Sequence, residues 1–185
     1  MRFLYLLFLV FVQISISNAQ EFAQFEVMDA NKIRFDGKLS RFFTVQEFEK
    51  TFGKTDSTAL LMDIQPCNYI FEYEDGSKDA DDEYWYKDGS RFERSKDRLA
   101  VDEFRFSNGH FILYDTIKLD ASTTTADLAK LFPNATKAID DIDVHGEGIL
   151  QLIILREDDQ NFSDGHICLF VKDGKLYFMH WWFPC

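Results

Sequence analysis

The side chains best suited to catalysis or metal binding are few in this chain, and their spacing fits neither role. The histidines are His110, His145, His166 and His180. No two of them are four residues apart, as two metal ligands on one helix face would be, and there is no HExxH motif. The GxSxG serine motif and the glycine-rich phosphate loops are also missing. The sequence therefore predicts a non-catalytic protein with no metal and no cofactor.

Carboxylates gather in two stretches, 75–83 and 140–147. Calcium prefers hard oxygen ligands, so either stretch is a candidate cation site. Neither follows the D-x-[DN]-x-[DN]-G order of a calcium loop. We interpret both as solvated acidic loops and keep cation binding as an alternative.

Three cysteines, Cys67, Cys168 and Cys185, allow three single pairings. There is no CxxC motif, so neither a redox pair nor a zinc site is indicated. Cys168 lies inside "HICLFV", which is typical of a buried strand and a packed thiol. Cys185 is the last residue, and a chain end gains most order from a cross-link, so we predict a Cys67–Cys185 disulfide. A thiol enzyme built on Cys168 or Cys67 is an alternative that requires an accessible thiolate.

Aromatic residues are dense in two places, "YWY" at 84–86 and "YFMHWWF" at 177–183. In a strand, alternate side chains point to opposite faces, so each group must divide between two faces of a sheet. One set packs against helices, and the other forms an aromatic patch with the composition of a binding hot spot. The candidate partner-binding residues are Tyr84, Trp85, Tyr86, His180, Trp181 and Trp182.

Two short amphipathic helices are predicted, at about 44–51 and 124–132, eighty residues apart. The first begins at Thr44 with Glu47 three residues later, the pattern of a capping box. The second begins in the same way, with a threonine and an aspartate. Apolar residues then recur at helical spacing in both.

Strand patterns follow the first helix in "ALLMDI", "NYIFEYE", "YWYKDGSRFER" and "VDEFRFSNGHFILYD". The last two contain Asp-Gly and Asn-Gly, which favour the tight turn of a hairpin. After the second helix come "ILQLIIL", "HICLFV" and "KLYFMHWWF", the last two joined by another Asp-Gly. Lys-Asp-Gly thus occurs at 87–89 and at 172–174.

These patterns predict an α+β fold made of two tandem repeats, each a helix followed by an antiparallel meander. Both repeats would share one sheet with both helices on one face, which leaves the other face free to bind a partner. The predicted repeats are 20–119 and 120–185, and two unrelated helix-plus-hairpin segments are the alternative.

The first nineteen residues have the pattern of a cleaved signal peptide: Arg2, a short apolar run, then Ser17 and Ala19 before the cut. We therefore expect a secreted or periplasmic protein without stable membrane insertion. The net charge of −12 disfavours nucleic acid and attracts a partner with a basic contact surface.

The helix-then-sheet order and "EFEKTFGK", which closes the first helix, resemble β-lactamase-inhibitor-protein-like proteins and the single-repeat outer-membrane assembly lipoproteins of the SmpA/OmlA type. Phe52-Gly53-Lys54-Thr55-Asp56 is close to the turn of those families, whereas Phe132-Pro133-Asn134 departs from it. The resemblance implies a non-catalytic protein that binds another exported protein, as an inhibitor, an immunity-type protein or an envelope assembly factor. Binding of a small ligand or cation is the alternative function.

Overall fold

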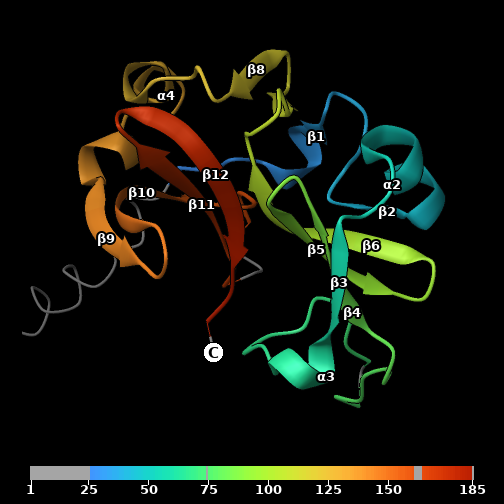
Figure 1. Ribbon diagram of the computed structural model, residues 1–185. Coiled ribbons are helices and arrows are strands. Elements are labelled where there is room, and N and C mark those ends of the chain that lie inside the picture. Colours follow the sequence, from blue (N-terminus) through green and yellow to red (C-terminus); the bar gives the residue numbers. More distant parts are fainter. Residues whose placement is uncertain (1–25, 74, 161–163, 185) are drawn as a thin grey trace, which may run out of the picture.

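The computed structural model describes residues 26–73, 75–160 and 164–184. They form an α+β fold dominated by antiparallel sheet (Figure 1). The helical elements are η2 (Ala30–Lys32), α2 (Val45–Phe52), α3 (Leu61–Ile64), α4 (Thr125–Leu131) and η3 (Ala135–Ala138). Within these residues, no helix is long and apolar enough to cross a membrane. The predicted signal peptide, 1–19, lies outside them.

The strands form two sheets. The smaller sheet has the order β1-β7-β8, from β1 (Ile33–Phe35), β7 (Phe111–Tyr114) and β8 (Ile117–Asp120). The larger sheet has the order β3-β4-β5-β6-β12-β11-β10-β9, and β2 (Phe42–Thr44) pairs with β6 beside this series. Its other strands are β3 (Ser57–Leu60), β4 (Glu83–Lys87), β5 (Ser90–Ser95), β6 (Arg98–Arg105), β9 (Asp140–Val144), β10 (Gly148–Arg156), β11 (His166–Lys172) and β12 (Lys175–Trp182). We predicted a single sheet, and that prediction is wrong because the structure has a second, three-stranded sheet.

The large sheet consists of two four-stranded antiparallel meanders joined through their last strands. β3 to β6 form one meander and β9 to β12 the other, and β6 pairs with β12. The turns at Asp88-Gly89 and Asp173-Gly174 form hairpins as predicted, with positive φ at all four residues. Asn108-Gly109 also has positive φ, but it connects β6 to β7 in the other sheet, so the hairpin predicted there is wrong.

Both predicted helices form, as α2 and α4, and each begins with a complete capping box. The side chains of Phe48 and Phe52 in α2 and of Leu128 in α4 are buried in the main core. That core lies between one face of the large sheet and a layer made of α2, α4 and the small sheet, seen along the upper side of Figure 1. Both helices thus cover the same face.

The opposite face of the large sheet is not left free. A second apolar cluster lies there, formed by Leu150, Cys168, Phe170 and Phe178. Over the first meander runs a segment without regular structure, residues 65–73, which we call the covering segment. "NYIFEYE" was predicted as a strand, and its residues 68–73 instead belong to this segment. In "ALLMDI" only Ala59 and Leu60 are strand, because α3 follows at once.

Candidate functional site

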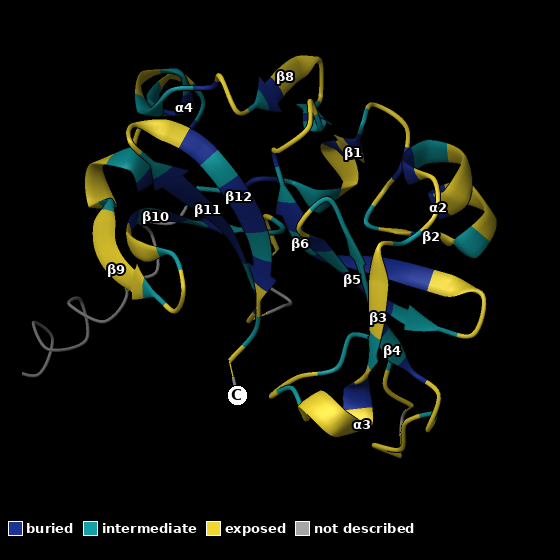
Figure 2. Cartoon of the chain, in the orientation of Figure 1, coloured by how far each residue is buried: buried dark blue, intermediate teal, exposed yellow. Residues whose placement is uncertain are grey.

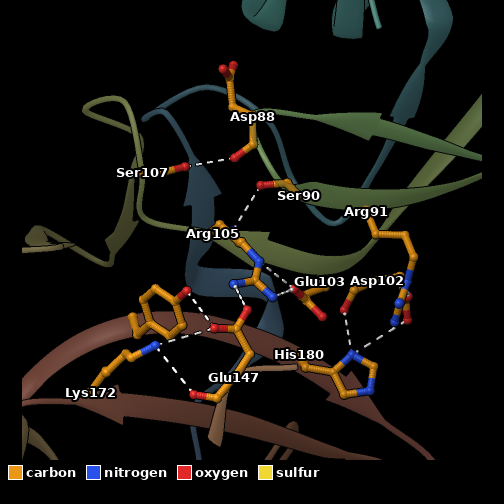
Figure 3. Close-up of polar contacts among 11 residues, drawn as sticks. Asp88, Ser90, Arg91, Asp102, Glu103, Arg105, Ser107, Glu147, Lys172 and His180 are labelled. Atoms are coloured by element: carbon orange, nitrogen blue, oxygen red, sulfur yellow. Dashed lines mark hydrogen bonds and ion pairs between the residues drawn. The ribbon is translucent and has the colours of Figure 1, made fainter. Parts of the chain in front are cut away.

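Two β-bulges lie at the centre of the large sheet. In β6, Arg91 pairs with Glu103 and Phe92 with Val101, so Asp102 is an extra residue. In β12, Phe170 pairs with Phe178 and Val171 with Leu176, so Tyr177 is extra. A bulge turns a side chain away from the regular alternation. Both extra residues take part in polar clusters, Asp102 with Arg91 and Tyr177 with Glu147. Figure 3 labels Asp102, Arg91 and Glu147.

The first cluster is formed by Arg91, Asp102 and His180, on β5, β6 and β12 (Figure 3). Arg91 Nε donates a short hydrogen bond to the buried Asp102 carboxylate. His180 Nδ1 lies 3.1 Å from the backbone oxygen of Asp102 and 3.7 Å from its Oδ1. The Arg91 guanidinium lies 5.1 Å from the ring centre of Tyr84, whose pKa is raised by burial. Arg91 thus supplies the opposite charge that the buried Asp102 carboxylate needs.

The second cluster connects the two meanders through Arg105 (Figure 3). Arg105 Nη1 is 2.7 Å from Glu147 Oε1, and Nη2 is 2.8 Å from Glu103 Oε1. The Tyr177 hydroxyl donates a hydrogen bond of 2.8 Å to Glu147 Oε2, and Lys172 Nζ lies 3.5 Å from the same oxygen. The hydrogen bond from Tyr177 is the largest cause that lowers the pKa of Glu147, followed by the one from Arg105. Glu147 lies in the β9–β10 turn, so this turn is held over the central strands.

Beside these clusters, β6 changes its pairing partner. Residues 103–105 of β6 pair with β12, whereas residues 98–100 pair with β2. After His180, β12 no longer pairs with β6. We call the region between this end of β12 and β2 the β2–β12 junction. Arg41 is packed here, its guanidinium 4.5 Å from the ring centre of Trp181 and 3.4 Å from Glu157. Burial lowers the pKa of Arg41 to about 10.

The covering segment is held at two points. The backbone N–H groups of Ile70 and Phe71 each donate a 2.8 Å hydrogen bond to the fully buried carboxylate of Glu93. At the other point, Asn68 Nδ2 donates to the carbonyl oxygens of Phe183 at 3.0 Å and Pro184 at 3.1 Å. Burial raises the pKa of Glu93. These contacts close one side of the β2–β12 junction.

A cavity of about 610 Å³ lies between the covering segment, β12 and the approach to β2. We call it the junction cavity. Its aromatic and polar lining includes Arg41, Phe42, Tyr69, Tyr84, Asp102, His180 and Trp182. Phe42 is 46 % exposed and Trp182 is 44 % exposed. The cavity therefore combines exposed aromatic rings with charged groups that already have partners.

The structure separates the six candidate binding residues. Trp181 is buried in the main core, and Trp85 packs against Phe48 on the helix side with ring centres 5.3 Å apart. Both rings thus pack towards the main core, although Trp181 is also part of the lining of the junction cavity and Trp85 is half-buried, so their role in binding stays a prediction. Tyr84, His180 and Trp182 line the junction cavity, although Tyr84 is itself buried.

Tyr86 is half-buried, and its ring centre lies 6.4 Å from that of Tyr84. The bulge places Tyr177 against the second apolar cluster together with Phe178, so strict alternation fails there. Elsewhere in the two aromatic groups the alternation placed each ring on the right face. It gave no indication of the covering segment, which buries Tyr84.

Sequence reasoning missed Arg41, Phe42, Arg91 and Asp102, and it considered Glu147 only as part of an acidic stretch that could bind a cation. Charged residues inside the central patterns "SRFERS" and "VDEFRF" were the available signal, because a strand in mid-sheet carries buried charges only when they are paired. Nothing near Arg41 in the sequence indicates that it packs against Trp181, which is far along the chain.

Cys168 is a free, buried thiol in the second apolar cluster. Burial raises its pKa to about 12, which disfavours the accessible thiolate that the thiol-enzyme alternative requires of Cys168. Cys185 lies outside the described residues, so the Cys67–Cys185 disulfide stays a prediction. It is consistent with the contacts of Asn68, which place the residue after Cys67 beside Phe183 and Pro184.

Among residues 26–73, 75–160 and 164–184, no group of three or more His, Cys, Asp or Glu side chains is arranged to hold a metal ion. Comparison with protein-family models, characterised proteins and solved structures finds no match to this chain. The resemblance to inhibitor-like and assembly-lipoprotein architectures therefore stays a prediction, and the function has to be argued from the site alone.

Proposed function

We propose that this chain is an exported, non-catalytic protein-binding module that binds its partner at the β2–β12 junction. The observation that carries the proposal is the junction cavity, with the exposed rings of Phe42 and Trp182 in its lining. Exposed aromatic rings around a depression are the usual anchor of a protein interface. An inhibitor, an immunity-type protein or an envelope assembly factor would each use such a surface.

Charge favours a partner with a basic contact surface. The chain has a net charge of −12. Exposed Glu72 lies in the covering segment, and exposed Asp75 and Asp81 lie on the loop that continues it. Asp164, also exposed, lies in the cavity lining. Such a surface raises the association rate of a basic partner at low salt and repels an acidic one.

Capture from an exported protein fraction tests this surface. Trp182→Ala removes an exposed ring of the junction cavity, and we expect it to weaken capture of the partner about 30-fold, the loss typical of a hot-spot residue. Ile149→Ala is the matched control, because Ile149 is 66 % exposed on β10 but does not line the cavity. Equal capture by Trp182→Ala, Ile149→Ala and the unchanged protein would contradict the proposal.

We further propose that the two meanders arose by duplication of one helix-plus-sheet unit, at about 20–119 and 120–185. Two equivalent hydrogen bonds support this. Val45 N, the first residue of α2, donates to Asp97 O in the β5–β6 turn at 2.9 Å. Thr125 N, the first residue of α4, donates to Gly174 O in the β11–β12 turn at 3.1 Å.

The residues just before the helices pair in the same way, Thr44 with Arg98 and Thr124 with Lys175. The Lys-Asp-Gly turns, by contrast, do not correspond. One joins the second and third strands of its meander, and the other joins the third and fourth. The helices and their contacts, rather than these turns, are the evidence for duplication.

Binding of a small ligand in the junction cavity is the second candidate function. A volume of about 610 Å³ is in the range of ligand pockets, and aromatic walls with a few polar groups are their usual lining. A thermal shift on addition of calcium, lipids or glycans to the purified protein would favour it. Unchanged melting with all of them would leave the protein-binding proposal as the better explanation.

A further inference from the structure

The two edges of the large sheet differ in their chemistry. At one edge, β9 carries Asp140, Asp141 and Asp143, all exposed. At the other edge, β3 has the sequence Ser-Thr-Ala-Leu, and three of its four residues are exposed (Figure 2). A free edge presents unpaired backbone N–H and C=O groups, and proteins usually protect it with charge, proline or a bulge. The β9 edge has such protection and the β3 edge has none.

Exposed apolar side chains continue from the β3 edge. Leu60 ends the strand, and Met62 and Ile64 lie in α3 directly after it. Met62 is 56 % exposed and Ile64 is 42 % exposed. Within the described part of the chain, β3 pairs with β4 alone. An uncharged edge strand next to exposed apolar residues is a surface suited to adding another strand.

We infer that the β3 edge is an interface between two copies of this chain, in which β3 pairs antiparallel with β3 of the second copy and the two large sheets become continuous. The sequence of the strand is suited to this self-pairing. A two-fold axis at Thr58, perpendicular to the sheet, places Thr58 opposite Thr58 of the second copy and Ser57 opposite Ala59, so no charge within the strand meets a like charge.

The residues that flank β3 favour the same arrangement. Exposed Lys54 precedes the strand and exposed Asp63 follows it, while Asp56, directly before the strand, is already paired with Lys87 Nζ at 2.9 Å. In an antiparallel pair about a two-fold axis, the end of the strand that bears Lys54 lies beside the end of the second copy that bears Asp63. Opposite charges therefore come together twice, even though the whole chain is acidic. This contact lies apart from the β2–β12 junction and does not depend on the proposed function.

Sedimentation velocity of the mature protein over a series of concentrations tests the inference. We expect the weight-average mass to rise from one chain towards two. Thr58→Lys places a positive charge on the edge strand. In the dimer, the two-fold axis brings the two introduced lysines close together, and they repel each other. It should raise the dimer dissociation constant at least tenfold. Ile149→Lys is the matched control, since it adds the same charge at an exposed position near the opposite edge, and it should dimerise normally.

Circular dichroism tests whether both variants are folded. If Thr58→Lys does not fold, Met62→Glu is a second variant that should lose the dimer. A protein that stays monomeric at every concentration would overturn the inference. So would dimerisation of Thr58→Lys at the unchanged dissociation constant, or loss of the dimer in Ile149→Lys. A monomer that binds an extended peptide along β3 would assign this edge to a different occupant and would also overturn it.

Discussion

At the scale of single residues, His110 has the most specific electrostatic environment. Its Nδ1 lies 2.8 Å from Asp36 Oδ2 and its Nε2 lies 3.1 Å from Asp88 Oδ2. The hydrogen bond to Asp36 is the largest cause that raises its pKa, and the bond to Asp88 adds to it. Because these carboxylates follow β1 and β4, the protonated ring connects the small sheet to the large one.

A raised histidine pKa means that the folded state binds the proton more tightly than the unfolded chain does. This stabilisation is complete below the unfolded pKa of about 6.5 and is lost as the pH rises through the folded pKa. We expect His110→Asn to lower the free energy of unfolding by about 1 kcal/mol at pH 6, with a smaller loss at pH 9. Urea unfolding at both pH values measures this difference.

The exposed His145, replaced by Asn, is the control and should behave like the unchanged protein at both pH values. A His110→Asn difference that stays constant with pH would show that the imidazolium is not the stabilising form.

At the scale of elements, the covering segment depends on one carboxylate. Glu93 accepts hydrogen bonds from the backbone of both Ile70 and Phe71, and its removal leaves two N–H groups without partners. We expect Glu93→Ala to lower the free energy of unfolding by about 2–3 kcal/mol. Amide hydrogen exchange at Ile70 and Phe71 should become much faster, while β11 amides stay protected.

Glu72→Ala provides the comparison, because Glu72 is an exposed carboxylate in the same segment. Its exchange pattern should match that of the unchanged protein. Slow exchange at Ile70 and Phe71 in Glu93→Ala would mean that another contact fixes this segment.

At the scale of the whole molecule, the two meanders share one core and are also joined by the Arg105–Glu147 ion pair. A shared core predicts a single cooperative unfolding transition for the whole chain. We expect a double-mutant cycle with Arg105→Met and Glu147→Gln to give a coupling energy of about 1 kcal/mol, since the pair is partly screened by solvent. Urea unfolding followed by circular dichroism and tryptophan fluorescence measures both.

Two separate transitions would indicate that the meanders fold independently. A coupling energy near zero would mean that the β9–β10 turn is held by its other contacts. Lys130→Met with Asp127→Asn is the comparison cycle, because this i,i+3 pair on α4 is exposed and lies within a single meander.

The sequence by itself determined the features that depend on near neighbours. The capping box of Thr44 and Glu47 closes within four residues, and Asp88-Gly89 and Asp173-Gly174 turn the chain because their own backbones accept positive φ. The alternation of Trp181 and Trp182 likewise follows from strand geometry. These interactions need no information from distant parts of the chain.

Only the tertiary structure decided which strand each strand pairs with and what covers the second face of the sheet. The change of partner along β6 and the bonds from Ile70 and Phe71 to Glu93 join residues far apart in the sequence. "NYIFEYE" has the composition of a strand, but the N–H groups of Ile70 and Phe71 within it bind a buried carboxylate instead of a neighbouring strand. Long-range partners of this kind are selected by packing of the whole core, which local patterns do not encode.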